Sequence, residues 1–477
     1  MTLSPLYKSQ DSAVHGWTSV AKDMRYGNAL SVATNADSPP PVNLPSLHIM
    51  VVTETWLPDI NGVASSMYAI LQQLKQMGHR ITLIRPSQGE QIEAERLSAR
   101  ANFMAVNEDN QVSSLPIPYY PHLRMGLPCY RFLYQQIRQC QPDIVHIVTE
   151  GPLGFAALMA AKRCGVKVSA GYHTAFHDFS RYFGWKVLAW PLLGYMKHFH
   201  NHCHATCVPS QTTEQQLSQF GFKRLYQVGR GVDTQKFSPT HRSLALREKW
   251  GAGDETTVLL YAGRVSPEKG IDTVIEGFKA LQLAQLHRDV KLVIVGDGPD
   301  KARLESQYQG DDSIIFAGFQ TGHILAVHYA SCDAFVFASQ IETFGNVVTE
   351  AMASGLPVFA YHDAAAALLV TPECGQTVTL GDNAAFIEMV RHLPKQQQLA
   401  KMRDKASEQV AGFSWQRAAL QLLTMFYQVL GISAQPLDEA LISTNSPKAD
   451  VVTGERVRPL TSSNASTKPA LISQTMA

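Results

Sequence analysis

Short apolar runs of strand length recur along the chain, and each precedes a stretch in which apolar residues return every three or four positions. In the second half, such runs occupy residues 257–262, 290–295 and 334–338. After the first of them, Ile271, Val274 and Phe278 lie on one face of a predicted helix. Strands that alternate with helices in this way favour βαβ units around a parallel sheet.

The first half of the chain shows the same alternation. Its predicted strands occupy residues 47–53, 81–84, 143–148, 166–171 and 205–209. Gly78 is expected to end the helix that follows the first of these strands, and Ser210 is expected to begin the helix that follows the last. Two sets of alternating strands and helices in 477 residues predict an α/β protein with two domains of similar build.

The two ends of the chain differ from this interior. Residues 1–45 are polar and Pro-rich toward their end, and the last residues are rich in Ser, Thr, Pro and Asn, so both segments are expected to be disordered. Ser414 is expected to cap one last amphipathic helix. The predicted boundaries are a leader at 1–45, domains at 46–233 and 234–412, the last helix at 413–432 and a tail at 433–477.

Composition narrows the classes of partner and location. A net charge of +1 gives no general attraction to polyanions, which argues against a nucleic-acid partner. No run of about 18 apolar residues predicts a membrane-spanning helix, and the first residues lack the apolar core of a secretory signal. Seven scattered cysteines are most simply reduced thiols. These features predict a cytoplasmic protein.

The strongest candidate site is the segment 339–357, which follows a predicted strand and contains a short helix. Glu342 lies in the loop and Glu350 lies two turns into the helix. The N–H groups of Phe344, Gly345 and Asn346 mark the helix start, where an anion is favoured. Because ligands sit at the carboxyl ends of parallel strands, this spacing suits a sugar joined through a diphosphate to a nucleoside. The alternative is an ordinary helix with two surface glutamates.

A second candidate segment follows the strand at 257–262. Gly263 and Arg264 end the strand, and a short loop carries Lys269. A planar guanidinium and a lysine ammonium both suit phosphate oxygens, although a solvated basic loop would look the same. The turn Gly-Asp-Gly-Pro at 296–299 ends the next strand, and its glycines allow a ligand to approach the backbone.

Histidine and cysteine are dense between residues 197 and 207, which suggests a zinc site. The spacing matches no regular zinc finger, and no second pair of ligands follows at a fixed distance. The segment also lies where a helix should lead into a strand. We therefore expect no metal site here.

The strand ending in Gly-Arg, the loop to Lys-Gly, the Gly-Asp-Gly-Pro turn and the two glutamates eight positions apart resemble retaining glycosyltransferases of family 4. The resemblance covers roughly residues 47–430, and within the family it is most similar to the branch of sulfoquinovosyl-diacylglycerol synthase and nucleotide-sugar-dependent α-mannosyltransferases. It implies the GT-B fold, in which two Rossmann-like domains face each other across a cleft and the C-terminal helix crosses back to the first domain.

The resemblance also implies the reaction and several residue roles. A hexose passes from a nucleotide-sugar to an acceptor hydroxyl with retention of configuration, a donor phosphate oxygen takes the acceptor proton, and neither a cofactor nor a metal is required. Arg264 and Lys269 stabilise the departing diphosphate, Glu342 holds a sugar hydroxyl, and Glu350 holds the ribose. Backbone groups near Gly318 and Phe319 are expected to contact the base, which the sequence leaves open between uridine and guanosine.

Two further site residues come from the first domain. Gly62 opens the first helix and allows a ligand to approach its start, although a plain entry turn would also use glycine. His173 follows a strand and is expected to face the cleft. In similar enzymes a histidine at this place contacts the donor sugar. The alternative is a histidine that forms part of the cleft wall without contacting the ligand. The branch usually reads His-Thr-Asn here, and Ala175 departs from that pattern. Arg230 and Asp233 lie at the expected hinge between the domains.

The segment 181–197 points to the acceptor. It combines Trp185, Trp190 and Tyr195 with basic residues, a combination found in segments that lie among lipid headgroups. Pro191 and neighbouring glycines are expected to prevent one regular helix. A packed helix pair is the alternative. We therefore expect a lipid acceptor, such as a diacylglycerol or glycolipid, and peripheral association with the inner face of the cytoplasmic membrane.

Other functions remain compatible with these patterns. The acceptor can be soluble or a polysaccharide, and a sugar-nucleotide epimerase of the same fold would bind the donor without needing an acceptor. A binding protein with an inactive site is a third class. The joint presence of Arg264, Lys269, Glu342 and Glu350 argues against that third class.

Overall fold

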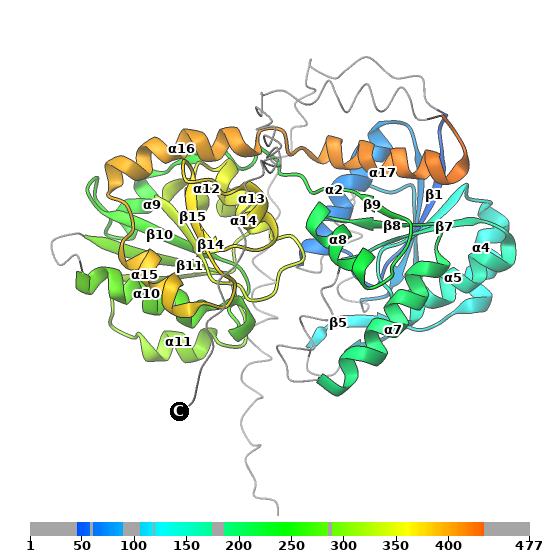
Figure 1. Ribbon diagram of the computed structural model, residues 1–477, viewed down its shortest axis with the longest axis horizontal. Coiled ribbons are helices and arrows are strands. Elements are labelled where there is room, and N and C mark those ends of the chain that lie inside the picture. The colour runs from blue at the N-terminus through cyan, green and yellow to red at the C-terminus, as the bar shows by residue number, and fades with distance from the viewer. Residues whose placement is uncertain are drawn as a thin grey trace, which may run out of the picture.

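The computed structural model describes residues 45–57, 61–88, 105–117, 120–173, 186–284 and 289–433. Almost all of the predicted leader and tail lies outside these ranges. Two Rossmann-like domains stand side by side, each a parallel sheet with helices packed on it (Figure 1). The predicted α/β architecture is confirmed.

The first domain has a seven-stranded parallel sheet in the order β3-β2-β1-β6-β7-β8-β9. Its strands are β1 (His48–Val52), β2 (Arg80–Pro86), β3 (Glu108–Val112), β6 (Ile144–Ile147), β7 (Lys167–Gly171), β8 (Ala205–Val208) and β9 (Leu225–Gln227). An antiparallel pair, β4 (Ser114–Ile117) and β5 (Tyr120–Gly126), lies beside the sheet. The central strands are buried on both faces, which explains their continuous apolar character.

The second domain has a six-stranded parallel sheet in the order β12-β11-β10-β13-β14-β15. Its strands are β10 (Thr257–Ala262), β11 (Val290–Val295), β12 (Ile314–Gly318), β13 (Ala334–Phe337), β14 (Val358–Tyr361) and β15 (Gly375–Val378). The order reverses between β10 and β13, so the loops after these two strands meet at the switch point of the sheet, where such folds bind ligands.

Helices connect the strands of both domains. In the first they are α2 (Gly62–Gln76), α4 (Tyr130–Cys140), α5 (Pro152–Cys164), α7 (Lys186–His202) and α8 (Gln211–Gln219). In the second they are η2 (Pro239–His241), α9 (Leu244–Lys249), η3 (Pro267–Lys269), α10 (Ile271–Ala284), α11 (Lys301–Gln307), α12 (Gly322–Ser331), α13 (Asn346–Ala353), α14 (Ala364–Leu369), α15 (Asn383–Arg391) and α16 (Gln396–Val410).

The last helix, α17 (Trp415–Leu430), lies over the first domain, although the residues before it belong to the second (Figure 1). Ser414 caps it by accepting a hydrogen bond from the Arg417 N–H, as the sequence predicts. Leu423 and Phe426 are fully buried in the same core cluster as Leu71 of α2. The predicted crossover helix is therefore confirmed.

One expectation for the first domain is wrong. Helix α7 runs without interruption over 17 residues, through Pro191 and Gly194. A proline here removes one backbone hydrogen bond near the start of the helix. The other half of α7 is anchored by Met196 and Phe199, which are buried, and this packing outweighs the local preference.

Two hydrogen bonds join the domains beside the switch point. The Asn346 side-chain amide donates to Ser66 Oγ over 2.9 Å, and the Thr343 hydroxyl donates to the His173 carbonyl oxygen over 2.8 Å. Thr343 lies in the loop between β13 and α13, and Asn346 is the first residue of α13. The start of α13 and the loop before it therefore contact the first domain.

Candidate active site

The start of α13 has the features that the sequence predicts for an anion site. Gly345 occupies the cap position with a φ of +84°, a left-handed conformation that favours glycine, and no side chain caps the helix. Phe344 is buried, and Asn346 is the first helical residue. The start of α13 is thus open to an external anion.

Lys269 and Glu342 form an ion pair between the two loops of the switch point. Lys269 Nζ lies 2.7 Å from Glu342 Oε1 and 2.9 Å from the Ile341 carbonyl oxygen. Both side chains are partly exposed, at 23% and 18%. The sequence assigns these residues to different parts of the ligand, and the structure shows in addition that they orient each other.

Glu350 lies deeper, on the buried side of α13. Its Oε2 accepts a hydrogen bond of 3.1 Å from the Tyr329 hydroxyl. Burial raises the pKa of Glu350 to about 7, against the smaller opposing effects of Lys236 and Tyr329. Near neutral pH, its ability to accept a hydrogen bond from a ribose hydroxyl therefore depends on pH.

Gly263, Arg264 and Phe319 lie at the carboxyl ends of β10 and β12, two strands of the same sheet that β11 separates. Gly263 and Arg264 follow β10, and the Arg264 side chain is exposed while its carbonyl oxygen accepts a bond from the buried Tyr261 hydroxyl. Phe319 follows the edge strand β12 and is half-buried. Arg264 and Phe319 thus line the same edge of the sheet as Lys269.

Helix α2 supplies the opposite wall. Its cap, Asn61, accepts hydrogen bonds from the Val63 and Ala64 N–H groups. A Cβ atom on Gly62 would lie 3.6 Å from the Asn346 amide nitrogen, so the starts of α2 and α13 approach each other. The positive ends of two helix dipoles therefore converge on one region between the domains.

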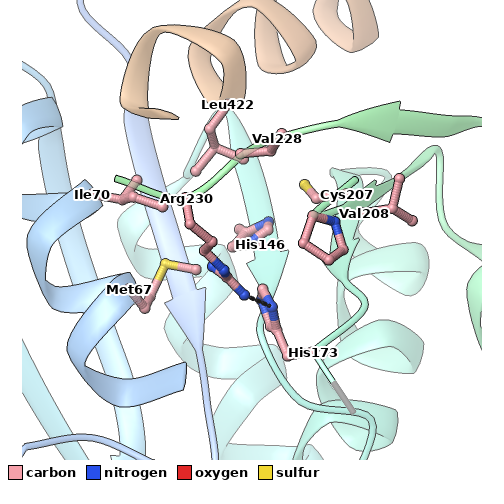
Figure 2. Close-up of a pocket in the computed structure, with 10 residues that line it drawn as sticks. Met67, Ile70, His146, His173, Cys207, Val208, Val228, Arg230 and Leu422 are labelled. Carbon is pink, nitrogen blue, oxygen red and sulfur yellow. Dashed lines mark hydrogen bonds between the residues drawn. The ribbon is translucent and has the colours of Figure 1, made fainter. Parts of the chain in front are cut away.

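His173 does not face an open cleft, and this expectation is wrong. It follows β7 as predicted, but its side chain is only 7% exposed and turns into the first domain. Its Nδ1 accepts a hydrogen bond of 2.7 Å from Arg230 Nη2, and both residues line a small interior cavity (Figure 2). Burial, followed by the charge of Arg230, lowers the pKa of His173 well below its ordinary range. What His173 offers to the region between the domains is its carbonyl oxygen.

The His/Cys-rich segment serves packing at several positions. His200 is fully buried, with Nε2 3.0 Å from Glu150 Oε1 and Nδ1 3.2 Å from Thr206 Oγ1. His198 and His202 are exposed and face each other on α7. Within the described ranges, no group of three or more His, Cys, Asp or Glu residues is arranged to hold a metal ion.

Some residues of the site escaped the sequence analysis. Tyr329 comes from α12, Thr343 from the donor-side loop, Ser66 from α2 and Arg230 from the linker between domains. Each acts across 20 or more positions of sequence, which local spacing does not reveal. Arg230 had one signal, since it stands in a Gly-Arg-Gly segment at the expected hinge.

This arrangement suits the cleavage of a sugar–diphosphate bond. Negative charge develops on the leaving diphosphate, and Arg264, Lys269 and the uncapped start of α13 supply fixed positive potential at one sheet edge. Glu342 and Glu350 lie 8 positions apart along the same segment and can hold hydroxyl groups at two places on the ligand. The fold and these residues define a two-domain glycosyltransferase.

Comparison with known proteins establishes the family. Residues 60–236 match the model described as Glycosyltransferase Family 4, and residues 243–410 match Glycosyl transferases group 1. The chain belongs to glycosyltransferase family 4 and is a retaining, nucleotide-sugar-dependent hexosyltransferase with the GT-B fold.

Particular relatives refine the resemblance. The chain is 34% identical over 389 residues to a GDP-mannose-dependent alpha-mannosyltransferase of Mycobacterium tuberculosis. The aligned region covers 81% of this chain and 97% of that protein. It is 28% identical to an alpha-monoglucosyldiacylglycerol synthase of Streptococcus pneumoniae, over 66% of this chain and 71% of that protein. The solved structure of Anabaena HepE with UDP and glucose superposes with a TM-score of 0.62 at 18% identity, covering 80% of this chain and all of that one, and supports the fold.

Proposed function

We propose that this protein transfers a hexose, with GDP-mannose as the first donor to test, to a hydroxyl group of a diacylglycerol or glycolipid at a membrane surface. The mannosyltransferase relative supports the donor, and the diacylglycerol synthase relative supports the acceptor. UDP-hexoses are the second class of donor to test.

The observation that carries the acceptor proposal is an apolar outer face on the first domain. Helix α5 presents Phe155 and Met159 to solvent one turn apart, exposed by 37% and 47%, where a soluble helix ordinarily presents polar residues. Helix α7 presents Trp190, exposed by 75%, and Tyr195, whose ring lies 6.2 Å from that of Phe155. The two helices therefore share one aromatic surface, which we call the α5–α7 face.

Basic residues border this face. Lys162 and Arg163, both exposed, lie in the last turn of α5, one turn beyond Met159. Apolar rings bordered by lysine and arginine suit the headgroup region of an anionic bilayer. No helix in the described part of the chain is long and apolar enough to span a bilayer. Peripheral binding is the mode that we propose. Trp185, the other tryptophan predicted for this segment, lies outside the described residues.

Liposome co-sedimentation tests the face. The variant Phe155→Ser/Trp190→Ser should bind anionic liposomes several-fold more weakly than the wild type at low salt. Leu283→Ser is the matched control, because Leu283 is also 75% exposed but lies on α10 of the second domain. Equal binding by all three proteins, or absence of the wild type from the pellet, contradicts the proposal.

An activity assay tests the reaction. GDP-mannose, UDP-glucose and UDP-galactose are each incubated with diacylglycerol or a glycolipid in vesicles and, separately, with a soluble sugar. Faster transfer to lipid by the wild type than by Phe155→Ser/Trp190→Ser supports the lipid acceptor. Faster transfer to the soluble sugar contradicts it while leaving the transferase assignment intact.

A further inference from the structure

Arg230 is a buried cation in the linker that joins the two domains. It follows β9, its side chain is 7% exposed, and no carboxylate pairs with it in the described part of the chain. Other buried arginines of this protein are paired differently: Arg85 contacts Asp109, and Arg247 contacts Asp333. A buried charge without a counter-ion is costly, because no opposite charge replaces the hydration that it loses. Packing alone therefore does not account for Arg230.

The partner of Arg230 is the imidazole of His173. Because a guanidinium only donates hydrogen bonds, Nδ1 of His173 must accept, and a neutral His173 then carries its proton on Nε2. Nε2 is buried without a partner in the described part of the chain, and it occupies the place of a side chain at Gly171. A Cβ atom at Gly171 would lie 2.1 Å from it, so only glycine leaves room for this ring position.

The backbone of His173 has a different neighbour. Its carbonyl oxygen accepts the hydrogen bond from Thr343, the residue that follows Glu342 in the loop leading to α13. One residue thus connects the interdomain linker, through its side chain, with the sugar-nucleotide loop of the second domain, through its backbone.

We propose that Arg230 is a positioning residue that acts through His173: it holds the imidazole in the Nε2–H form and so places the His173 carbonyl oxygen that anchors Thr343 and the loop of Glu342. The inference rests on the nucleotide-sugar site of the proposed function and not on the lipid acceptor. In this proposal the interdomain linker, through Arg230, fixes where the loop of Glu342 and Thr343 lies relative to the first domain.

Other groups face the pair as well. Within the described residues, the titratable groups that act on His173 besides Arg230 are His146 of β6 and His200 of α7, and Cys207 of β8 acts on Arg230. Helices α2 and α17 contribute only apolar residues to the shared cavity, namely Met67, Ile70 and Leu422. Burial is the larger cause of the low pKa of His173, so removing the Arg230 charge should leave the ring neutral but release Nδ1 from its role as acceptor.

The first test is spectroscopic and needs no substrate. In the full-length protein with 15N-labelled histidine, the His173 signal is assigned by its loss in His173→Gln. The wild-type signal should remain that of a neutral Nε2–H ring from pH 8 to pH 5.5, and in Arg230→Met the Nδ1–H tautomer should become populated. A wild-type ring in the Nδ1–H form, or an Arg230→Met ring that stays entirely in the Nε2–H form, overturns the proposal.

The second test is kinetic. Arg230→Met should lower kcat/KM for the nucleotide-sugar about tenfold, the scale of coupling between neighbouring residues. Arg230→Lys keeps a charge and a donor and should recover part of the rate. In a His173→Gln background, Arg230→Met should add less than twofold, because its effect passes through His173. Additive losses indicate a brace for folding only and overturn the proposal.

A matched pair of variants tests the other end of the connection. Thr343→Val removes the hydroxyl that binds the His173 carbonyl oxygen, and Thr343→Ser retains it. The valine variant should lose several-fold more kcat/KM than the serine variant, and equal losses contradict the proposed path. Calorimetry of nucleotide-sugar binding gives the same comparison without any acceptor. A failure of the lipid proposal therefore leaves this test intact.

Discussion

The carboxyl edges of the two sheets handle charge in opposite ways. In the second domain, Arg264 is exposed and the Lys269–Glu342 pair is partly exposed, so all three side chains can reach a ligand. In the first domain, His173 and Arg230 turn inward and are each only 7% exposed. The same topology thus presents charges at one edge and buries them at the other. We interpret the first arrangement as chemistry on the donor and the second as control of position.

A pair of glutamates shows the same contrast. Burial raises the pKa of both Glu54 and Glu350 to about 7. Glu54, after β1, accepts a hydrogen bond of 3.0 Å from the Leu153 N–H at the start of α5, and therefore serves as a helix cap. Among the described residues, Glu350 has a tyrosine hydroxyl as its hydrogen-bond partner and remains able to accept from a ligand. Similar pKa values thus accompany different tasks.

The largest effect should come from the exposed charges of the second domain. Lys269→Ala or Arg264→Ala should lower kcat by about 10²- to 10³-fold, the scale for removing one preorganised donor to developing charge. Thermal stability should change little, because both positions lie at an open edge. Lys401→Ala, an exposed lysine on α16, is the control. Near-normal turnover by Lys269→Ala would show that the diphosphate binds elsewhere.

The two glutamates of the donor segment should separate binding from turnover. Glu350→Gln should weaken nucleoside diphosphate binding about tenfold, because ribose hydroxyls donate better to a carboxylate than to an amide. Glu342→Gln should reduce turnover more than it reduces this binding. Calorimetry with GDP and UDP measures both, and an equal loss in the two variants argues against the division of roles.

The pH dependence of binding sharpens that prediction. The pKa of Glu350 is about 7, so the carboxylate form predominates above pH 7 and the protonated form below it. Wild-type affinity for nucleoside diphosphate should therefore fall as the pH falls from 8 to 6. The affinity of Glu350→Gln should stay flat over this range, and a parallel decline in both proteins assigns the titration to another group.

The sequence predicts the second domain better than the first for a physical reason. Its candidate donor residues lie in two short segments, Arg264 with Lys269 and Glu342 with Glu350, so their spacing can be read locally. In the first domain, the direction of the His173 side chain depends on Arg230, 57 positions away. The continuity of α7 through Pro191 likewise depends on tertiary packing.

A smaller effect should appear in stability at Glu54. Burial raises its pKa to about 7 from the ordinary 4.5 of a glutamate, so the folded state binds more protons than the unfolded state between these pH values. The part of the free energy of unfolding that this site contributes is therefore lost as the pH rises from about 4.5 to 7. Glu54→Gln keeps the Oε1 acceptor but does not titrate, and its melting temperature should exceed that of the wild type by a few degrees at pH 8 and match it at pH 5. The opposite order at pH 8 contradicts the assignment of Glu54 as a buried cap.

The smallest expected effect is that of metal removal. This experiment tests whether the protein's own charges are enough to stabilise the leaving diphosphate. Arg264, Lys269 and the uncapped start of α13 together face the region where the diphosphate is expected to lie, so we predict that activity after EDTA treatment equals untreated activity within error. Mg²⁺ and Mn²⁺ are then added back to the wild type and to Lys269→Ala. A rise in the variant but not in the wild type would show that a cation can replace the lysine. Loss of wild-type activity in EDTA with recovery in Mg²⁺ would show instead that the exposed charges of the second domain do not suffice.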